Sequence, residues 1–256
     1  MGQHGKYGAL VRARLRSALL ALTGVASLGL GASAARAQDQ TCRLALLLAM
    51  DVSASVDARE YRLQRDGTAA ALSDPDVRRA ILEGSGPVAL AAYEWSGRQQ
   101  QAVILPWIMI DSAAALDAAV ATLARTQRVH VGFPTAAGYG LGFGAGMMQD
   151  APPCLRKVID VSGDGVNNEG FLPSLAYANF PFQDVTVNGL AILGPDRGVL
   201  DFYQNEIRHG PGAFVQIADG FDDFLRAMTL KLFRETNDMQ LGALPGAPQP
   251  QPEDAG

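Results

Sequence analysis

The chain has 256 residues, with 21 lysines and arginines against 26 aspartates and glutamates, and a formal net charge of −5. The first 37 residues hold five of the basic side chains and no acidic one, so the other 219 residues carry a net charge of about −10, which argues against a nucleic-acid partner. The apolar fraction of 48% is ordinary for a globular protein, and a chain of this length can bury one substantial core.

Residues 1–37 have the features of a secretory signal peptide. A cluster of basic residues precedes an uncharged stretch from Ser17 to Ala35, and Ala35-Arg36-Ala37 supplies the small residues typical of a cleavage site. The uncharged stretch is rich in Ala and Gly and weakly apolar for a permanent membrane span. We therefore expect cleavage near Ala37, export to the periplasm or the exterior, and no stable membrane insertion afterwards; an uncleaved anchor is the less favoured alternative.

Six segments after this leader predict β-strands. Two of them, Leu44–Met50 and Val158–Val161, are mainly apolar and each leads to an aspartate, which is typical of buried parallel strands. The other four strand candidates are Val88–Trp95, Gln101–Met109, Val185–Leu193 and Ala213–Ile217.

Helical patterns separate most of these strands. Asp57 and Glu60 have the spacing of a capping box at the start of the first helix. Alternating strands and helices predict an α/β fold with a doubly wound, mostly parallel central sheet and helices on both faces. No helical pattern lies between Gly86 and Met109, so the second and third strands should form a hairpin that leaves one antiparallel edge strand. The predicted helices are Ala58–Leu72, Ser112–Leu123, Thr135–Met148, Val199–Ile207 and Phe221–Phe233.

The predicted helix Thr135–Met148 is unusual because it contains five glycines. Each glycine costs about 1 kcal/mol relative to alanine inside a helix, so an irregular Gly-rich loop is the alternative. Gly138, Gly142 and Gly146 would share one flat helix face, which would let the helix lie very close to a neighbour. Pro134 and the glycines make a membrane-spanning interpretation of this segment poor.

The two cysteines, Cys42 and Cys154, are expected to form a disulfide in an exported protein. Each lies just before a predicted strand, and the aspartates Asp51 and Asp164 follow at similar distances along the chain. Neighbouring parallel strands are about 4.8 Å apart, a separation that suits a disulfide. Such a bridge would place the two strands side by side, so that both aspartates meet at the carboxyl edge of the sheet, where open α/β sheets bind ligands. Two unpaired thiols are the alternative.

Asp51-x-Ser53-x-Ser55 follows a strand and leads into a helix, so that one carboxylate and two hydroxyls can point to the same place. Such hard oxygen donors suit Mg²⁺, Mn²⁺ or Ca²⁺, and Mg²⁺ is our preferred ion. Residues 160–165 resemble the start of an EF-hand calcium loop, but Phe171 stands where that loop needs glutamate. A phosphatase site built on Asp51 would need a second aspartate where Ser53 stands.

The order and spacing of Asp51-x-Ser53-x-Ser55, Thr135 and Asp164 resemble the metal-ion-dependent adhesion site of von Willebrand factor type A domains. The resemblance covers about residues 43 to 236, and it is closest to an uncharacterised, exported bacterial branch of that superfamily. The segments that carry this closer likeness are Glu60-Tyr-Arg-Leu-Gln-Arg65, Glu94-Trp-Ser-Gly97, Pro106-Trp107, Val158-Ile-Asp-Val-Ser-Gly-Asp-Gly165 and Gly210-Pro-Gly-Ala-Phe214.

The resemblance implies a role for each residue of the site. Ser53 and Ser55 would bind the metal directly, Thr135 directly or through water, and Asp51 and Asp164 mostly through water. An open coordination position could then accept a carboxylate from a protein partner. This chain departs from the family pattern after the threonine, where Gly138-Tyr139 stands in place of the usual Gly-Asp.

These expectations describe a signal peptide (1–37), a von Willebrand factor A-like domain (38–236) and a disordered tail (237–256) that has little to bury. The expected function is metal-dependent binding of an acidic group on a protein partner, without catalysis. The alternative is a metal-assisted hydrolase, which would need a general base that the sequence does not reveal. The roles of Asn167, Asn168 and Glu169 are left open: they lie near the metal or contact the partner, or they belong to an ordinary solvated loop.

Overall fold

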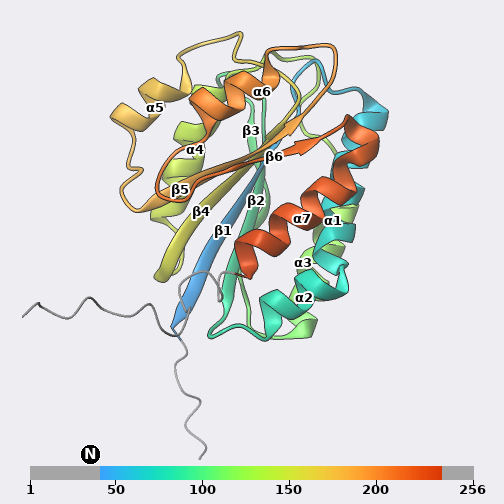
Figure 1. Ribbon diagram of the computed structural model, residues 1–256, viewed down its shortest axis with the longest axis vertical. Coiled ribbons are helices and arrows are strands. Elements are labelled where there is room, and N and C mark those ends of the chain that lie inside the picture. Colours follow the sequence, from blue (N-terminus) through green and yellow to red (C-terminus); the bar gives the residue numbers. More distant parts are fainter. Residues whose placement is uncertain (1–40, 238–256) are drawn as a thin grey trace, which may run out of the picture. The chain divides into compact units, whose positions relative to one another are not determined.

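The computed structural model describes residues 41–237; the expected signal peptide and nearly all of the expected tail lie outside this range. A six-stranded sheet with the order β3-β2-β1-β4-β5-β6 forms the centre of the domain (Figure 1). Only β3 runs antiparallel to its neighbour, so the predicted hairpin and edge strand are confirmed. The strands are β1 (Cys42–Asp51), β2 (Val88–Trp95), β3 (Gln101–Ile110), β4 (Cys154–Gly163), β5 (Val185–Ile192) and β6 (Val215–Ala218).

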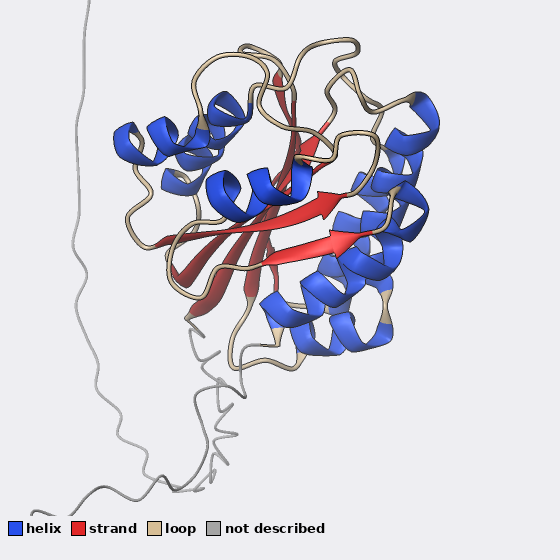
Figure 2. Cartoon of the chain, turned by 45° about the horizontal axis from the view of Figure 1, so that its top comes forward, coloured by secondary structure: helices blue, strands red, loops and turns tan. Residues whose placement is uncertain are grey.

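Helices cover both faces of the sheet, as predicted (Figure 2). One face packs against α1 (Ala58–Ser73), α2 (Pro75–Leu82), α3 (Ala113–Arg125) and α7 (Phe224–Thr236). The other face packs against α4 (Ala137–Gln149), α5 (Pro173–Asn179) and α6 (Val199–Phe202), which continues into a π-helical turn, η1 (Tyr203–Ile207). A short 3-10 turn, η2 (Phe221–Asp223), precedes α7.

β1 lies at the centre of the sheet, and all ten of its residues are buried. Leu44, Leu46 and Leu48 belong to the core beneath α1 and α7, while the alternate residues Ala45 and Leu47 belong to the core beneath α4. A strand that is buried on both faces needs apolar side chains at every position, which explains the continuous apolar run in the sequence.

Cys42 and Cys154 form the predicted disulfide, with a Cα–Cα distance of 4.4 Å. The two cysteines are direct partners in the β1–β4 register, which continues to the pair Met50 and Ser162. The next residues along the two strands are Asp51 and Gly163. The bridge therefore joins the strands at one end, and the predicted site lies at the other, at the top of Figure 1.

The Gly-rich segment is the helix α4, and the alternative of an irregular loop is wrong. Several of its glycines permit close packing, since a Cβ on Gly140 would lie 2.9 Å from the Trp95 ring and one on Gly144 would lie 2.6 Å from the Tyr93 hydroxyl. Thr135, predicted as the first helical residue, instead lies in the preceding loop. The physical reason is that its backbone N–H donates to the Asn168 side chain, which holds it outside the helix.

Two substitutions in α4 should change stability in opposite directions. A Cβ on Gly138 would lie 2.2 Å from the Phe171 carbonyl oxygen, whereas one on Gly146 would meet nothing within 4 Å. Gly138→Ala should therefore lower the free energy of unfolding by about 1–3 kcal/mol, and Gly146→Ala should raise it by about 0.5–1 kcal/mol. Urea denaturation of both variants checks this, and equal effects would contradict the packing described here.

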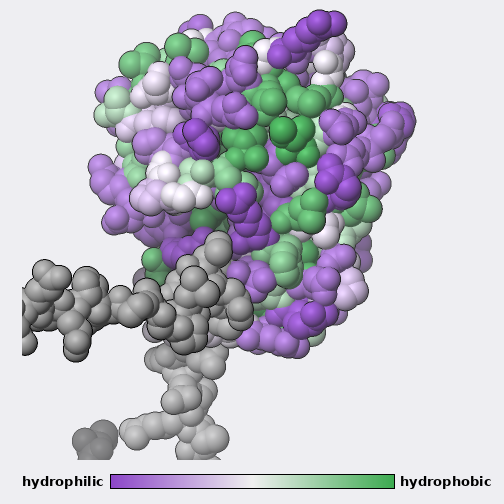
Figure 3. Space-filling model, viewed as in Figure 1, coloured by the Kyte–Doolittle hydropathy of each residue, from purple (hydrophilic) through white to green (hydrophobic). Residues whose placement is uncertain are grey.

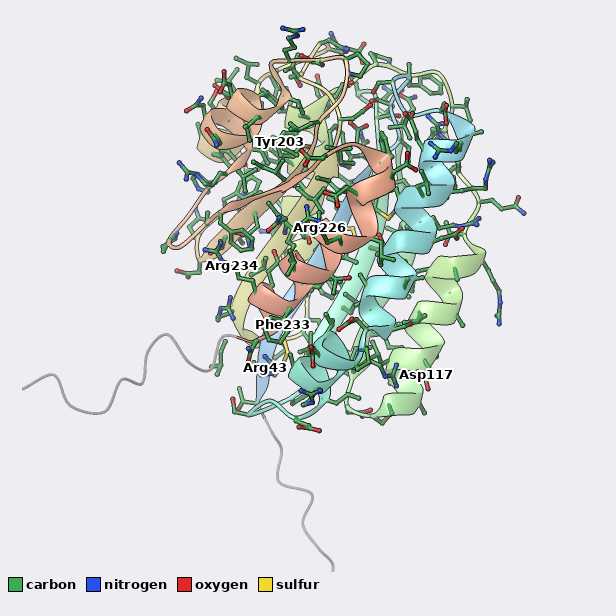
Figure 4. The ribbon with its side chains drawn as sticks, turned by 45° about the vertical axis from the view of Figure 1, so that its right-hand side comes forward. Arg43, Asp117, Tyr203, Arg226, Phe233 and Arg234 are labelled. Carbon is green, nitrogen blue, oxygen red and sulfur yellow. A yellow bond between two sulfur atoms is a disulfide. The ribbon has the colours of Figure 1, made fainter. Side chains whose placement is uncertain are left out.

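Arg43 is a buried arginine at the opposite end of the sheet from the predicted site. Its guanidinium donates to the carbonyls of Gly86, Ala80 and Thr236, so it ties β1 to the last turns of α2 and α7 (Figure 4).

No helix within residues 41–237 is long and apolar enough to cross a membrane. The outer surface that includes α7 carries scattered apolar side chains among hydrophilic ones (Figure 3).

Candidate metal site

Four of the five predicted site residues meet at the carboxyl ends of β1 and β4. The backbone N–H of Ser53 donates to Asp51 Oδ1 at 2.8 Å, which bends the chain after β1 into a tight loop. The hydroxyls of Ser53 and Ser55 lie 3.1 Å apart, and Ser55 Oγ donates to Asp164 Oδ1 at 2.7 Å. The β1–α1 loop and the end of β4 thus bring two hydroxyls and two carboxylates together.

Thr135 reaches the same place from the loop before α4. Its N–H donates to Asn168 Oδ1, and its carbonyl accepts from the N–H groups of Asn168 and Glu169. A Cβ built on Gly165 would lie 3.8 Å from Thr135 Oγ1 and 3.9 Å from Ser55 Oγ, so both hydroxyls lie beside the same glycine. Asn168, whose role the sequence left open, therefore positions Thr135.

Burial makes this group of oxygens electrostatically unusual. Asp51 is completely buried, and its Oδ2 has no hydrogen-bond partner within the described range. Burial and the nearby Asp164 raise the pKa of Asp51 to about 7, against the lowering effect of its hydrogen bonds from Ser53 and the charge of Arg128. Burial also raises the pKa of Asp164. A cation would stabilise both carboxylates in their charged form, and the unpaired buried oxygen fits such an ion.

The donor set defines which ions fit. No group of three or more His, Cys, Asp or Glu side chains that could hold a metal ion occurs between residues 41 and 237. The candidate site instead combines two carboxylates with three hydroxyls. Such a set lacks the nitrogen and sulfur donors that zinc favours and matches a hard cation that keeps some of its water.

A cleft of about 340 Å³ opens over these residues. Ser55, Thr135 and Asp164 line it, together with two acidic residues that the sequence analysis did not assign to the site, Glu60 and Asp196. Asp196 follows β5 and accepts from the N–H groups of Val166 and Gly198. Because β5 lies beside β4, the loop after β5 must reach the same edge of the sheet, which is the signal that could have located Asp196.

Arg128 supports the β1–α1 loop from its other side. Its guanidinium donates to the carbonyls of Val52, Ser53 and Val56, and to that of His130. Glu94 is fully buried nearby, where it accepts from the Tyr61 hydroxyl and from the N–H of Val129.

Gln64 holds the base of the same loop, since it donates to the carbonyl of Asp51 and accepts from Ser162 Oγ. The serines are therefore presented by a loop that side chains of α1 and of the segment after α3 hold in place. Neither Arg128 nor Gln64 is predicted as a site residue, because no local sequence pattern marks a side chain that donates to loop carbonyls.

A family model described as "Protein of unknown function (DUF1194)" matches residues 41–240. No curated protein matches the chain. Among solved structures, the chain is similar to proximal thread matrix protein 1 from the mussel byssus, with 14% identity, a TM-score of 0.58, and coverage of 77% of this chain and 49% of that one. Another structure of that mussel protein is described as having a zinc-occupied MIDAS motif, a metal-ion-dependent adhesion site.

Two further structures show the same fold. A von Willebrand factor type A protein from Catenulispora acidiphila is 16% identical, with a TM-score of 0.51 over 77% of this chain and 43% of that one. The pilus adhesin SpaC from Lactobacillus rhamnosus GG is 14% identical, with a TM-score of 0.54 over 78% of this chain and 31% of that one. The chain spans about half or less of the length of these proteins, and at such identities the likeness shows the fold alone.

Proposed function

The chain belongs to the family of proteins of unknown function DUF1194 and has a von Willebrand factor A-like domain, and from this premise we propose that it is an exported, metal-dependent binding module. The observation that carries the proposal is the meeting of three hydroxyls with the carboxylates of Asp51 and Asp164 under an open cleft. The zinc-occupied site of the mussel protein supports binding of a divalent cation by a fold of this kind.

We assign a direct or a water-mediated metal contact to each residue according to whether its oxygen is neutral or charged. Ser53, Ser55 and Thr135 would offer neutral oxygens, while Asp51 and Asp164 would act mainly through bound water. Few charged ligands would leave the ion electrophilic, so that a carboxylate from a partner protein could complete its coordination. We propose Mg²⁺ as the ion because every donor is oxygen. Export to the periplasm or exterior is supported by the disulfide.

We favour binding over catalysis because of the residues that line the cleft. Its ionisable side chains are Glu60, Asp164 and Asp196, and each already accepts hydrogen bonds: Glu60 from the N–H of Asp57, Asp164 from Ser55 Oγ, and Asp196 from the N–H groups of Val166 and Gly198. A hydrolase would need a general base placed against a metal-bound water. Metal-dependent turnover of a panel of esters and phosphoesters by the purified protein would reverse this choice.

Mg²⁺ should stabilise the wild-type protein but not the variant Ser53→Ala/Asp164→Ala. At a metal concentration about 100 times Kd, binding to the folded state alone raises the free energy of unfolding by about 2.7 kcal/mol. The double variant lacks one hydroxyl and one carboxylate of the site and should show no increase. Thermal or urea unfolding with Mg²⁺ and with chelator measures the difference.

Asp117→Ala is the matched control, because this exposed carboxylate on α3 (Figure 4) pairs with Arg78 on the surface and lies neither in the metal cleft nor in its loops. It should keep the full metal-induced increase. If the double variant keeps it as well, the site assignment is wrong.

A further inference from the structure

A second cleft, of about 470 Å³, lies on the other side of the β1–α1 loop from the metal cleft. Ala54 is exposed and lines both clefts, and we call this shared boundary the ridge. The N–H of Ala54 donates to the Phe133 carbonyl at 2.7 Å, which ties the ridge to the loop before Thr135. The two clefts therefore share a fixed boundary.

The lining of this second cleft is basic. Arg62, Arg65 and Arg128 line it, against one acidic residue, Asp57. The metal cleft has the opposite character, since its charged lining residues are all acidic. Val131, which is 69% exposed, adds an apolar wall to the basic cleft.

The three arginines differ in how they are already bound. Arg128 is anchored by loop carbonyls, and Arg65 is bound by Asp66 and the Thr126 carbonyl. Arg62, on the exposed side of α1, has no hydrogen bond or ion pair with any residue of the described range. Its charge helps to lower the pKa of the nearby Asp57 without a hydrogen bond between the two side chains, so its planar guanidinium can still bind an anion, and such a group suits the two oxygens of a carboxylate.

We propose that the basic cleft binds a second carboxylate of the same partner segment whose first carboxylate binds the metal. This inference rests on the proposed function and specifies the partner further: an extended protein segment with two acidic residues that crosses the ridge at Ala54. Opposite charges in the two clefts would orient the segment, since the acidic metal cleft accepts a carboxylate only when the metal is present, whereas the basic cleft attracts one directly.

Short peptides test the proposal on the mature protein. The probes are acetylated, amidated peptides with two glutamates separated by about one to four glycines, a series that changes the spacing of the carboxylates in steps of about 3.3 Å along an extended chain. Matched peptides carry glutamine in place of either glutamate. With Mg²⁺, the two-acid peptide of the best spacing should bind about three- to tenfold tighter than either one-acid peptide, and high salt should reduce the difference.

Arg62→Gln should remove this gain while leaving the Mg²⁺-dependent part of one-acid peptide binding and the Mg²⁺-induced stabilisation unchanged. Arg59→Gln is the matched control, because Arg59 lies on the same helix, pairs with Asp222 and lines neither cleft. Titration calorimetry or NMR chemical shifts measure the dissociation constants. The control variant should keep the full gain of the two-acid peptide.

The outcomes separate the two proposals. If one-acid peptides bind with Mg²⁺ but a second glutamate or Arg62 makes no difference, the basic cleft is wrongly assigned and the proposed function stands. If Arg62-dependent binding of two-acid peptides needs no metal, the basic cleft binds a carboxylate and the metal-dependent function is wrong. If no peptide binds, both are contradicted. If inorganic phosphate binds at Arg62 while two-acid peptides gain nothing, the cleft is a general anion site and the inference is overturned.

Discussion

Replacement of Lys231 by methionine should lower the free energy of unfolding by about 3–5 kcal/mol, the usual cost of leaving buried charges without their partner. Lys231 lies on α7 and is completely buried. Its Nζ is 2.8 Å from Asp160 Oδ1 on β4 and 2.5 Å from Glu235 Oε1 on α7. Methionine keeps the apolar stem but leaves both carboxylates buried without a cation.

The loss should depend on pH in a defined direction. Burial, followed by the charge of Glu235, raises the pKa of Asp160 to about 7 even with Lys231 present. The folded protein therefore holds this proton more tightly than the unfolded chain, so the contribution of Asp160 to stability decreases as pH rises from about 4 to about 7. Without Lys231 the pKa should rise further, and the defect should be smaller at about pH 5 than at about pH 8.

Arg226→Ala provides the control on the same helix (Figure 4). Arg226 pairs with Asp223 at the exposed side of α7, and surface pairs of this kind contribute about 0–1 kcal/mol. Urea unfolding of both variants at the two pH values gives the comparison. If the loss for Lys231→Met is as small as for Arg226→Ala, the buried charges contribute little to holding α7 on the sheet.

Much of the fold could be predicted from the sequence because the strand signals and the helix signals agree. The β1 segment is apolar at every position from Leu44 to Met50, as a strand buried on both faces requires, and Val88–Trp95 was predicted with its observed bounds. The Asp57 capping box is present as predicted. The spacing of the two cysteines also placed β1 beside β4, because a disulfide restricts which strands can be neighbours.

Two helices were missed, although each has a recognisable start. α2 begins with Pro75 after the N-cap Asp74, and α5 begins with Pro173. Proline is favoured in the first turn of a helix, where its missing N–H costs nothing. Both helices have eight residues or fewer, so their apolar periodicity is too short to stand out.

The residues of the candidate metal site were also only partly predictable from the sequence. Asp51, Ser53, Ser55 and Asp164 lie at strand ends that the sequence already marks, so their meeting could be predicted. The contribution of Arg128 could not, because it depends on bonds between segments far apart in the chain. The charge of the second cleft also appears only once α1 and the loop after α3 are placed together.

Replacing both cysteines by alanine should lower the free energy of unfolding by about 4–5 kcal/mol. The bridge joins residues separated by 112 positions, and in the chain-entropy model a loop of this size restricts the unfolded chain by about that amount. Alanine is the suitable replacement because Cys42 is buried, and a serine hydroxyl there would add its own cost. Urea unfolding of the double variant beside the wild type measures the loss.

The same variant separates global stability from the geometry of the site. The bridge lies at the amino end of β1, about 30 Å of strand away from Asp51, and hydrogen bonds along the whole β1–β4 pair hold the register without it. The increase in stability caused by Mg²⁺ should therefore be the same in the double variant and the wild type, although both of the variant's unfolding curves shift to lower urea. A reduced Mg²⁺ effect would mean that the disulfide, and not the strand pairing, sets the alignment of Asp51 with Asp164.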